Sequence, residues 1–214
     1  MIRRFKDKLA GYAPDAGPYP AGDIFATVGF MADSKHNPTY LSDRFPGPDP
    51  YAPLSDLPPL EVTSADFADG DKLPAEQCGS DAVSPQLSWT PGPEGTKTYA
   101  VTCFDPDAPT ASGYWHWAVF NIPASVTSLP ANAGDESLQN LPDGAVSLRG
   151  DSRSYGYYGA NPPAGHGPHR YIYAVHAVGE ELDLDDHQTP TVLGFNLNFK
   201  ATARGLLWGW TEDS

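Results

Sequence analysis

The sequence is short of cysteine, of basic residues and of long apolar runs. Only two of its 214 residues are cysteines, Cys78 and Cys103, so no disulfide framework is indicated and a reducing compartment fits. No apolar run approaches the length of a membrane span, and no apolar segment follows the basic N-terminus as it would in a signal peptide. We therefore predict a cytoplasmic protein without a membrane span, and we expect Cys103, inside an apolar run, to be buried.

The shortage of basic residues limits the kinds of partner. The chain has 13 Lys and Arg against 27 Asp and Glu, a formal net charge of −14, and four of the basic residues lie in the first nine positions. Without a basic stripe, binding to nucleic acid or tight docking on an anionic bilayer is disfavoured. A small anionic ligand still fits, provided that its pocket supplies local hydrogen-bond donors.

The composition indicates one core built from short elements. Hydrophobic residues make up 40% and aromatic residues 12% of the chain, whereas 21 Gly and 23 Pro predict many turns and few long helices. No strand-like run is followed by a Gly-x-Gly-x-x-Gly or Walker motif, and no internal repeat is visible. These features favour a β-rich fold without a nucleotide-binding loop.

The chain divides into an extension, residues 1–58, and a domain, residues 59–214. Residues 1–9 have the spacing of two helical turns, and the rest of the extension is rich in turn-forming residues and aromatics. One interpretation is a passive tail. The other is an arm whose stretch from Phe25 to Tyr51 packs on the domain or on a second subunit of a homodimer, while the first turn stays mobile.

Short apolar runs after residue 60 predict strands, at 60–63, 86–89, 99–104, 116–122, 145–148, 170–178 and 206–210. The run 170–178 is apolar on both faces and is expected to be an interior strand. Thr189 and Pro190 predict the start of a helix whose spacing continues to Gly205. The fold class that follows is mostly β, an antiparallel β-sandwich with a C-terminal helix.

Two separated segments concentrate polar groups on stiff backbone. In Asp105-Pro-Asp-Ala-Pro109 the prolines restrict the chain, so one carboxylate is expected to face a pocket and the other to cap the loop; the alternative is a solvated turn. His116 follows at the start of a strand, between aromatic residues that can wall a site. For Trp117 simple core packing is the preferred interpretation.

The second segment runs from Tyr158 to Tyr171. Its amides at residues 159–161 are candidates for an anion-binding nest, and the alternative is a structural turn. His169 and Tyr171 are two residues apart and share a strand face, whereas Arg170 points the opposite way and is expected to pair with a carboxylate. His166 and His176 fit no constellation and are interpreted as structural or exposed.

Taken together, the two motifs resemble the phosphatidylethanolamine-binding protein family, especially its bacterial, Raf-kinase-inhibitor-like branch, over roughly residues 60–212. The resemblance implies a Greek-key β-sandwich with a small anion pocket at one end. It implies that this pocket contains Asp105, Asp107, His116, His169 and Tyr171, with Pro109 and Tyr114 as walls and Asn161, Pro162 and Pro163 as a covering loop. Asn161 and Ala160 depart from the residues usual in relatives, so the resemblance leaves the loop shape and the ligand open, and we expect this loop to control the choice of ligand.

Three functions follow as hypotheses. The first is a regulatory protein that binds a phosphate, phospho-group or carboxylate and acts on a protein partner, for instance as a kinase inhibitor. The second is a hydrolase in which the Asp and His side chains act as general acid and base, although neither motif holds an activated Ser or Cys. The third is a metal site of two His and one carboxylate. We expect no cofactor and no catalytic residue.

Overall fold

The structure is a computed structural model that describes residues 45–213. The expected helical turn at residues 1–9 and the aromatic residues of the arm before residue 45 lie outside this range. Within the described part, no helix is both long and apolar enough to cross a membrane.

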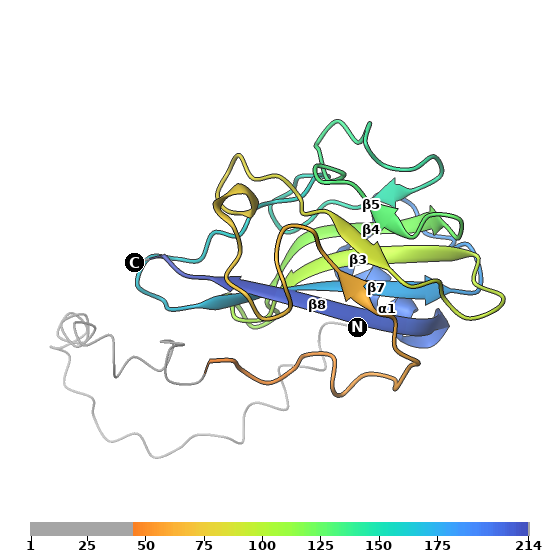
Figure 1. The fold of residues 1–214 in the computed structure, drawn as a ribbon, viewed down its shortest axis with the longest axis horizontal. Coiled ribbons are helices and arrows are strands. Elements are labelled where there is room, and N and C mark those ends of the chain that lie inside the picture. Colours follow the sequence, from red (N-terminus) through yellow and green to blue (C-terminus); the bar gives the residue numbers. More distant parts are fainter. Residues whose placement is uncertain (1–44, 214) are drawn as a thin grey trace, which may run out of the picture. The chain divides into compact units, whose positions relative to one another are not determined.

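Two antiparallel sheets make up the domain (Figure 1). The smaller sheet has the order β1 (Val62–Thr63), β2 (Leu87–Trp89), β5 (Ser128–Leu129). The larger sheet has the order β6 (Val146–Ser147), β4 (Tyr114–Pro123), β3 (Thr98–Asp105), β7 (His169–Val178), β8 (Ala201–Thr211). A short 3-10 turn at Ala75–Gln77 and one α-helix complete the described elements, so the expected fold class is confirmed.

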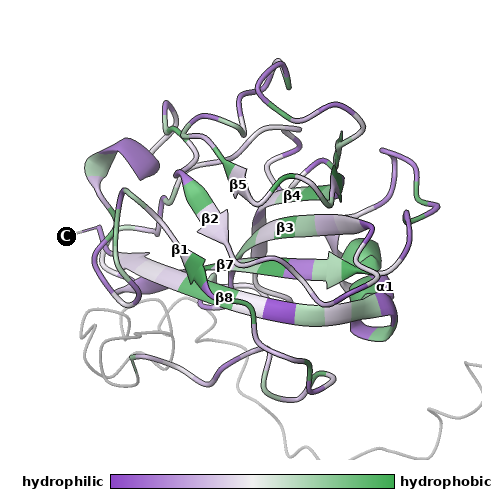
Figure 2. Ribbon diagram, turned by 45° about the vertical axis from the view of Figure 1, so that its right-hand side comes forward, coloured by the Kyte–Doolittle hydropathy of each residue, from purple (hydrophilic) through white to green (hydrophobic). Residues whose placement is uncertain are grey.

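The main core lies between the two sheets. Leu87 and Leu129 of the smaller sheet and Tyr99, Trp117 and Tyr173 of the larger sheet belong to one cluster of buried side chains. Trp117 is a core residue, as expected, and Cys103 is fully buried in the same cluster. Every residue of β7 is buried, which confirms that this strand is interior. Figure 2 shows how hydrophobic residues gather along the strands and the helix.

Helix α1 (Pro190–Lys200) covers part of the opposite face of the larger sheet. It begins where the sequence predicts: Thr189 is the N-cap, its side chain accepts a hydrogen bond from the amide of Val192, and Pro190 occupies the first turn. Leu193 and Leu197 pack against Ala100, Ala118 and Phe120.

The predicted end of this helix was wrong. The helix ends at Lys200, and the helical spacing of Ala201 and Gly205 is accidental, because both residues already belong to β8. Pairing with β7 supplies the backbone of residues 201–211 with hydrogen bonds along the whole strand, which outweighs the local pattern. The last strand therefore begins five residues before the expected position.

The described part of the extension packs on the same face of the larger sheet. The ring of Phe45 meets those of Trp208 and Trp210, with centroids 6.2 and 5.7 Å apart. Tyr51 is 7% exposed and clusters with Ile172. For residues 45–58 the arm therefore follows the packed interpretation, and the aromatic side chains provide its apolar contacts.

Candidate functional site: a cavity at the end of the larger sheet

A cavity of about 290 Å³ lies where β3 ends and where β4 and β7 begin. This edge collects polar side chains because three neighbouring strands deliver their terminal residues to it. The cavity is lined by Asp105, Ala108, Pro109, Thr110, Tyr114, His116, Tyr158, Asn161, Pro163 and His169.

Asp105 is the last residue of β3 and organises the site. Its Oδ1 accepts hydrogen bonds from the amides of Asp107 and Ala108, at 2.7 and 2.9 Å, and thus shapes the proline-bounded turn. Its Oδ2 accepts a hydrogen bond from Nδ1 of His169 at 2.7 Å. Asp105 therefore both lines the cavity and caps the loop. The sequence predicts separate carboxylates, those of Asp105 and Asp107, for these two roles.

His169 is held at both ring nitrogens. Nδ1 donates to Asp105, and Nε2 lies 2.8 Å from Nδ1 of His166. His169 is 1% exposed, so this chain of carboxylate and two imidazoles is largely shielded from water. The interpretation of His166 as unconnected to any constellation was wrong, because the loop after Pro163 turns back and places its imidazole on His169.

His116 lies at the start of β4 inside a cage of tyrosine rings. Its Nδ1 donates to the carbonyl of Tyr158 at 2.7 Å, which leaves Nε2 as the nitrogen for a ligand. The ring centroids of Tyr114, Tyr158 and Tyr171 lie 5.0, 5.8 and 5.0 Å from that of His116. Burial lowers the pKa of His116, so the imidazole is neutral near pH 7.

Asp107 does not line the cavity. Its two oxygens accept hydrogen bonds from Nε and NH2 of Arg170, each at 2.8 Å, and Oδ2 also accepts from the Arg170 amide. The placement of Asp107 in the pocket is therefore corrected: Arg170 leaves β7 on the face opposite His169 and draws the carboxylate to that side. The expectation that Arg170 pairs with a carboxylate agrees with this geometry.

Two further expected lining residues lie behind the wall. Tyr171 is fully buried beneath His116, and burial raises the pKa of its phenol. Pro162 is buried, and Pro163 faces the cavity instead. The amide of Ala160 donates to the carbonyl of Gln77, so it is not free for an anion-binding nest.

The cavity also contains residues that the motifs alone do not single out. Ala108 and Thr110 belong to the turn after Asp105, and Tyr158 opens the second segment. Tyr158 had a usable signal, since an aromatic residue directly before a glycine-rich loop is well placed to wall a pocket. His166 had none, because its contact with His169 depends on the path of the loop.

The described residues hold no group of three or more His, Cys, Asp and Glu side chains arranged for a metal ion. The hydrogen bonds explain why. Both oxygens of Asp105 and both nitrogens of His169 are already engaged within the protein. The polar groups of Asp105 and His169 are therefore already satisfied by hydrogen bonds within the protein.

The two-sheet fold with a polar cavity at one end defines the class of protein, and comparisons with known proteins agree. The family model described as phosphatidylethanolamine-binding protein matches residues 63–210. The chain therefore belongs to the phosphatidylethanolamine-binding protein family.

Individual relatives support the assignment. The Escherichia coli UPF0098 protein YbhB is 44% identical over 151 residues, which are 67% of this chain and 94% of YbhB. The crystal structure of E. coli YbcL superposes with a TM-score of 0.69 at 40% identity, covering 72% of this chain and 99% of that one. A homologue from Chlamydia trachomatis shares the fold, with a TM-score of 0.61 at 24% identity, over 73% of this chain and 99% of the homologue.

Proposed function

We propose that the cavity binds a small phosphate-, phospho- or carboxylate-bearing ligand and that the protein is regulatory rather than catalytic. The observation that carries the proposal is the meeting of His116 and His169, from two different strands, at one small cavity. Imidazoles fixed by neighbouring hydrogen bonds are pre-organised to exchange a proton with an oxyanion.

The protonation state of His116 sets how such a ligand binds. Because the imidazole is neutral and its Nδ1 donates to Tyr158, Nε2 presents a lone pair to the ligand. An anion therefore binds best together with a proton, carried either by the ligand or by Nε2. Affinity for phosphate-like anions is expected to rise as the pH falls through the histidine range.

The remaining charge at the site is small. No Lys or Arg lines the cavity, so no permanent cation attracts the ligand. The carboxylate of Asp105 accepts three hydrogen bonds, from Asp107, Ala108 and His169, which reduces its repulsion of an anion. These features favour modest affinity, suited to reversible regulation by an abundant metabolite or a lipid head group.

The hydrolase alternative has less support from the geometry. Asp107 is bound to Arg170 and is not available as a general acid or base in the cavity. Among the lining residues the one aliphatic hydroxyl, that of Thr110, donates to the carbonyl of Gly113. Without a hydroxyl or thiol next to an imidazole, no nucleophile is activated.

The output that we propose is ligand-dependent binding to a protein partner, for instance inhibition of a kinase or another enzyme, in the cytoplasm. Both cysteines are free, which fits a reducing compartment. Association into a homodimer through the arm is part of the same proposal.

Calorimetry with inorganic phosphate, phosphoethanolamine and acetate between about pH 5 and 8 tests the binding. We expect binding that strengthens at low pH and that is lost in His116→Gln. His187→Gln, an exposed histidine outside the cavity, is the matched control. Absence of binding at every pH would overturn the proposal, and turnover of phosphate or acetate esters that His116→Gln abolishes would favour the hydrolase.

A further inference from the structure

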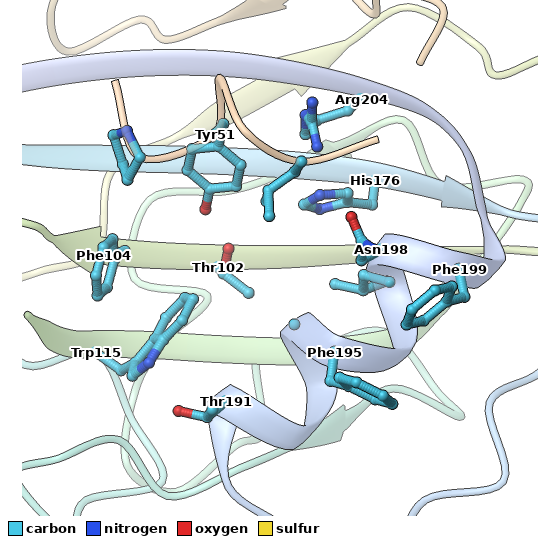
Figure 3. Close-up of a pocket in the computed structure, with 14 residues that line it drawn as sticks. Tyr51, Thr102, Phe104, Trp115, His176, Thr191, Phe195, Asn198, Phe199 and Arg204 are labelled. Atoms are coloured by element: carbon cyan, nitrogen blue, oxygen red, sulfur yellow. The ribbon is translucent and has the colours of Figure 1, made fainter. Parts of the chain in front are cut away.

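A second cavity, of about 370 Å³, lies on the other side of the molecule's larger sheet. It is bounded by helix α1 on one side and by residues 50–54 of the arm on the other, with β3, β4 and β7 beneath (Figure 3). Asp105, His116 and His169 do not line it, so it is a separate site.

The walls of this cavity are mostly apolar. The rings of Phe104 and Trp115 lie against each other with centroids 4.4 Å apart, and Tyr51, Leu54 and Leu197 complete the enclosure. Close rings and aliphatic groups favour a flat apolar guest, and the volume lies within the range of small-molecule pockets.

The floor carries buried polar atoms without hydrogen bonds. Oγ1 of Thr102 and Nδ1 of His176 have no partner among the described residues, although the two residues are only 1% and 4% exposed. The hydroxyl of Tyr51 points toward that of Thr102 (Figure 3), and their interaction partly offsets the effect of burial, which raises the pKa of the Tyr51 phenol. A buried polar atom that lacks a hydrogen-bond partner is destabilising, so Nδ1 of His176 and the hydroxyls beside it suit a ligand that supplies further hydrogen bonds.

The floor carries no net charge. Burial, reinforced by the neighbouring Arg204, lowers the pKa of His176 to about 3, so its imidazole is neutral at physiological pH. Arg204 itself lies toward the mouth, over the ring of Tyr51, and donates to the carbonyl of Ser55. An uncharged polar group is therefore the better match for the floor, because a buried charge without a partner is costly.

Gly194 keeps the cavity open from the side of the helix. A Cβ at this position would meet only the Trp115 ring, at 3.9 Å, so neither crowding nor a left-handed backbone requires glycine here. Glycine in a helix interior is less favourable than alanine. Its effect is to leave the slot beside Trp115 unfilled.

We propose that this second cavity binds a small neutral aromatic alcohol, a compound of the phenol class. The aromatic body fits against the rings of Tyr51, Phe104 and Trp115, and the hydroxyl both donates to and accepts from the groups on the floor. The exposed rings of Phe195 and Phe199, 68% and 70% exposed, extend the apolar surface at the mouth and can cover a short alkyl substituent.

Titration of the full chain with 4-propylphenol and with propylbenzene, followed by nuclear magnetic resonance, tests the proposal. One satisfied hydrogen bond predicts that the phenol binds about ten-fold more tightly. Thr102→Val is expected to remove most of this difference while the protein stays folded. Gly194→Leu is expected to abolish binding of both compounds without changing phosphate binding at the end cavity, the one lined by Asp105, His116 and His169. Gly194→Ala, whose Cβ fits, is the control.

Three results would overturn the proposal. Equal affinity for the two compounds would show that the floor atoms take no part. Tighter binding of 4-propylbenzoate than of the phenol would show that Arg204 selects an anion. Unchanged phenol binding in Gly194→Leu would place the ligand elsewhere on the protein.

Discussion

Several side chains in the end cavity already form hydrogen bonds with other residues of the protein. His169 uses Nδ1 for Asp105 and Nε2 for His166, whereas His116 keeps Nε2 available. The two imidazoles are therefore unequal. Under the proposed function we therefore expect His116 to contact the ligand directly, and His169 to do so only if His166 moves away.

Replacing His166 tests this inequality. In His166→Ala the Nε2 of His169 loses its neighbour and faces the cavity, so a second imidazole can contact the anion. We expect phosphate affinity to rise by about ten-fold, the value of one additional charge-assisted hydrogen bond. Calorimetry at about pH 6 measures the change, and His187→Ala serves as the control. Weaker binding would show that His166 itself contacts the ligand, and unchanged binding would show that the freed Nε2 of His169 does not reach it.

Asn161 tests the choice of ligand. Its side chain is exposed at the rim of the cavity and carries an amide that can donate to an anion or obstruct it. We expect Asn161→Gly to change the ratio of affinities for phosphate and acetate with little effect on the melting temperature, because an exposed side chain contributes little to stability. If the ratio stays constant in competition experiments, the loop does not select the ligand.

At the scale of elements, strand β7 separates two polar systems. Alternation along the strand sends His169 and Tyr171 to the side of the cavity and Arg170 to the opposite side. Arg170 then joins the turn after β3 to the arm, because its NH1 also donates to the carbonyls of Gly47 and Pro48. The ion pair with Asp107 is therefore a structural link, and neither of its residues lines the cavity.

Asp107→Ala distinguishes these two roles. The side chains of Arg170 and Asp107 are only 7% and 9% exposed, and removing one partner of such an ion pair leaves a nearly buried charge. We expect the free energy of unfolding to fall by about 3–5 kcal/mol, with phosphate affinity unchanged. Urea unfolding and calorimetry report the two quantities, and Asp143→Ala, at an exposed carboxylate, is the control. If the folded variant no longer bound phosphate, Asp107 would be needed for ligand binding after all.

At the scale of the whole molecule, buried histidines make stability depend on pH. His176 has a folded-state pKa of about 3, against an ordinary value of 6.5, and burial lowers the pKa of His116 as well. In both cases the histidine becomes protonated at a higher pH in the unfolded chain than in the folded protein. Their contribution to stability is complete above about pH 6.5 and is lost as the pH falls.

The free energy of unfolding should consequently decrease between about pH 6.5 and 3. His176 alone accounts for up to about 1.4 kcal/mol per pH unit in this range. We expect His176→Gln to flatten the decrease, as measured by urea unfolding at a series of pH values. His187→Gln, at an exposed position, should leave the slope unchanged. An unaltered slope in His176→Gln would mean that carboxylates dominate the acid sensitivity.

The arm is the other feature that acts on the whole molecule. Truncation to a chain beginning at Leu57 removes Phe45, Tyr51 and the carbonyls that bind Arg170. Burial of Tyr51 alone is worth about 1.5–3 kcal/mol, so we expect a clear loss of stability. A chain beginning at Ser42 retains these contacts and is the control.

Solution mass of both truncated chains and of the full chain tests the homodimer. Dissociation of the chain beginning at Leu57 would support association through the arm. Equal masses and equal melting temperatures in all three chains would show that the arm is a passive tail.

The sequence by itself determined the features that depend on local order. Alternation with a period of two placed His169 and Arg170 on opposite faces, and the Thr189-Pro190 pair marked the start of the helix. The strands near residues 87, 101, 118 and 174 followed from apolar runs between turn residues. The two polar motifs also contain Asp105, His116 and His169, which line the same cavity. These predictions could be made from the sequence because each pattern depends only on residues that are close together along the chain.

Only the tertiary structure decided how these groups meet. Asp107 joined Arg170, 63 residues away, because their strand ends lie side by side on the outer face. His166 reached His169 through the path of a loop, and β8 began at Ala201 because pairing with β7 outweighs helical spacing. The second cavity arises from Tyr51, Thr102 and His176, which are distant in sequence. Such contacts depend on the packing of whole elements, to which no local pattern in the sequence corresponds.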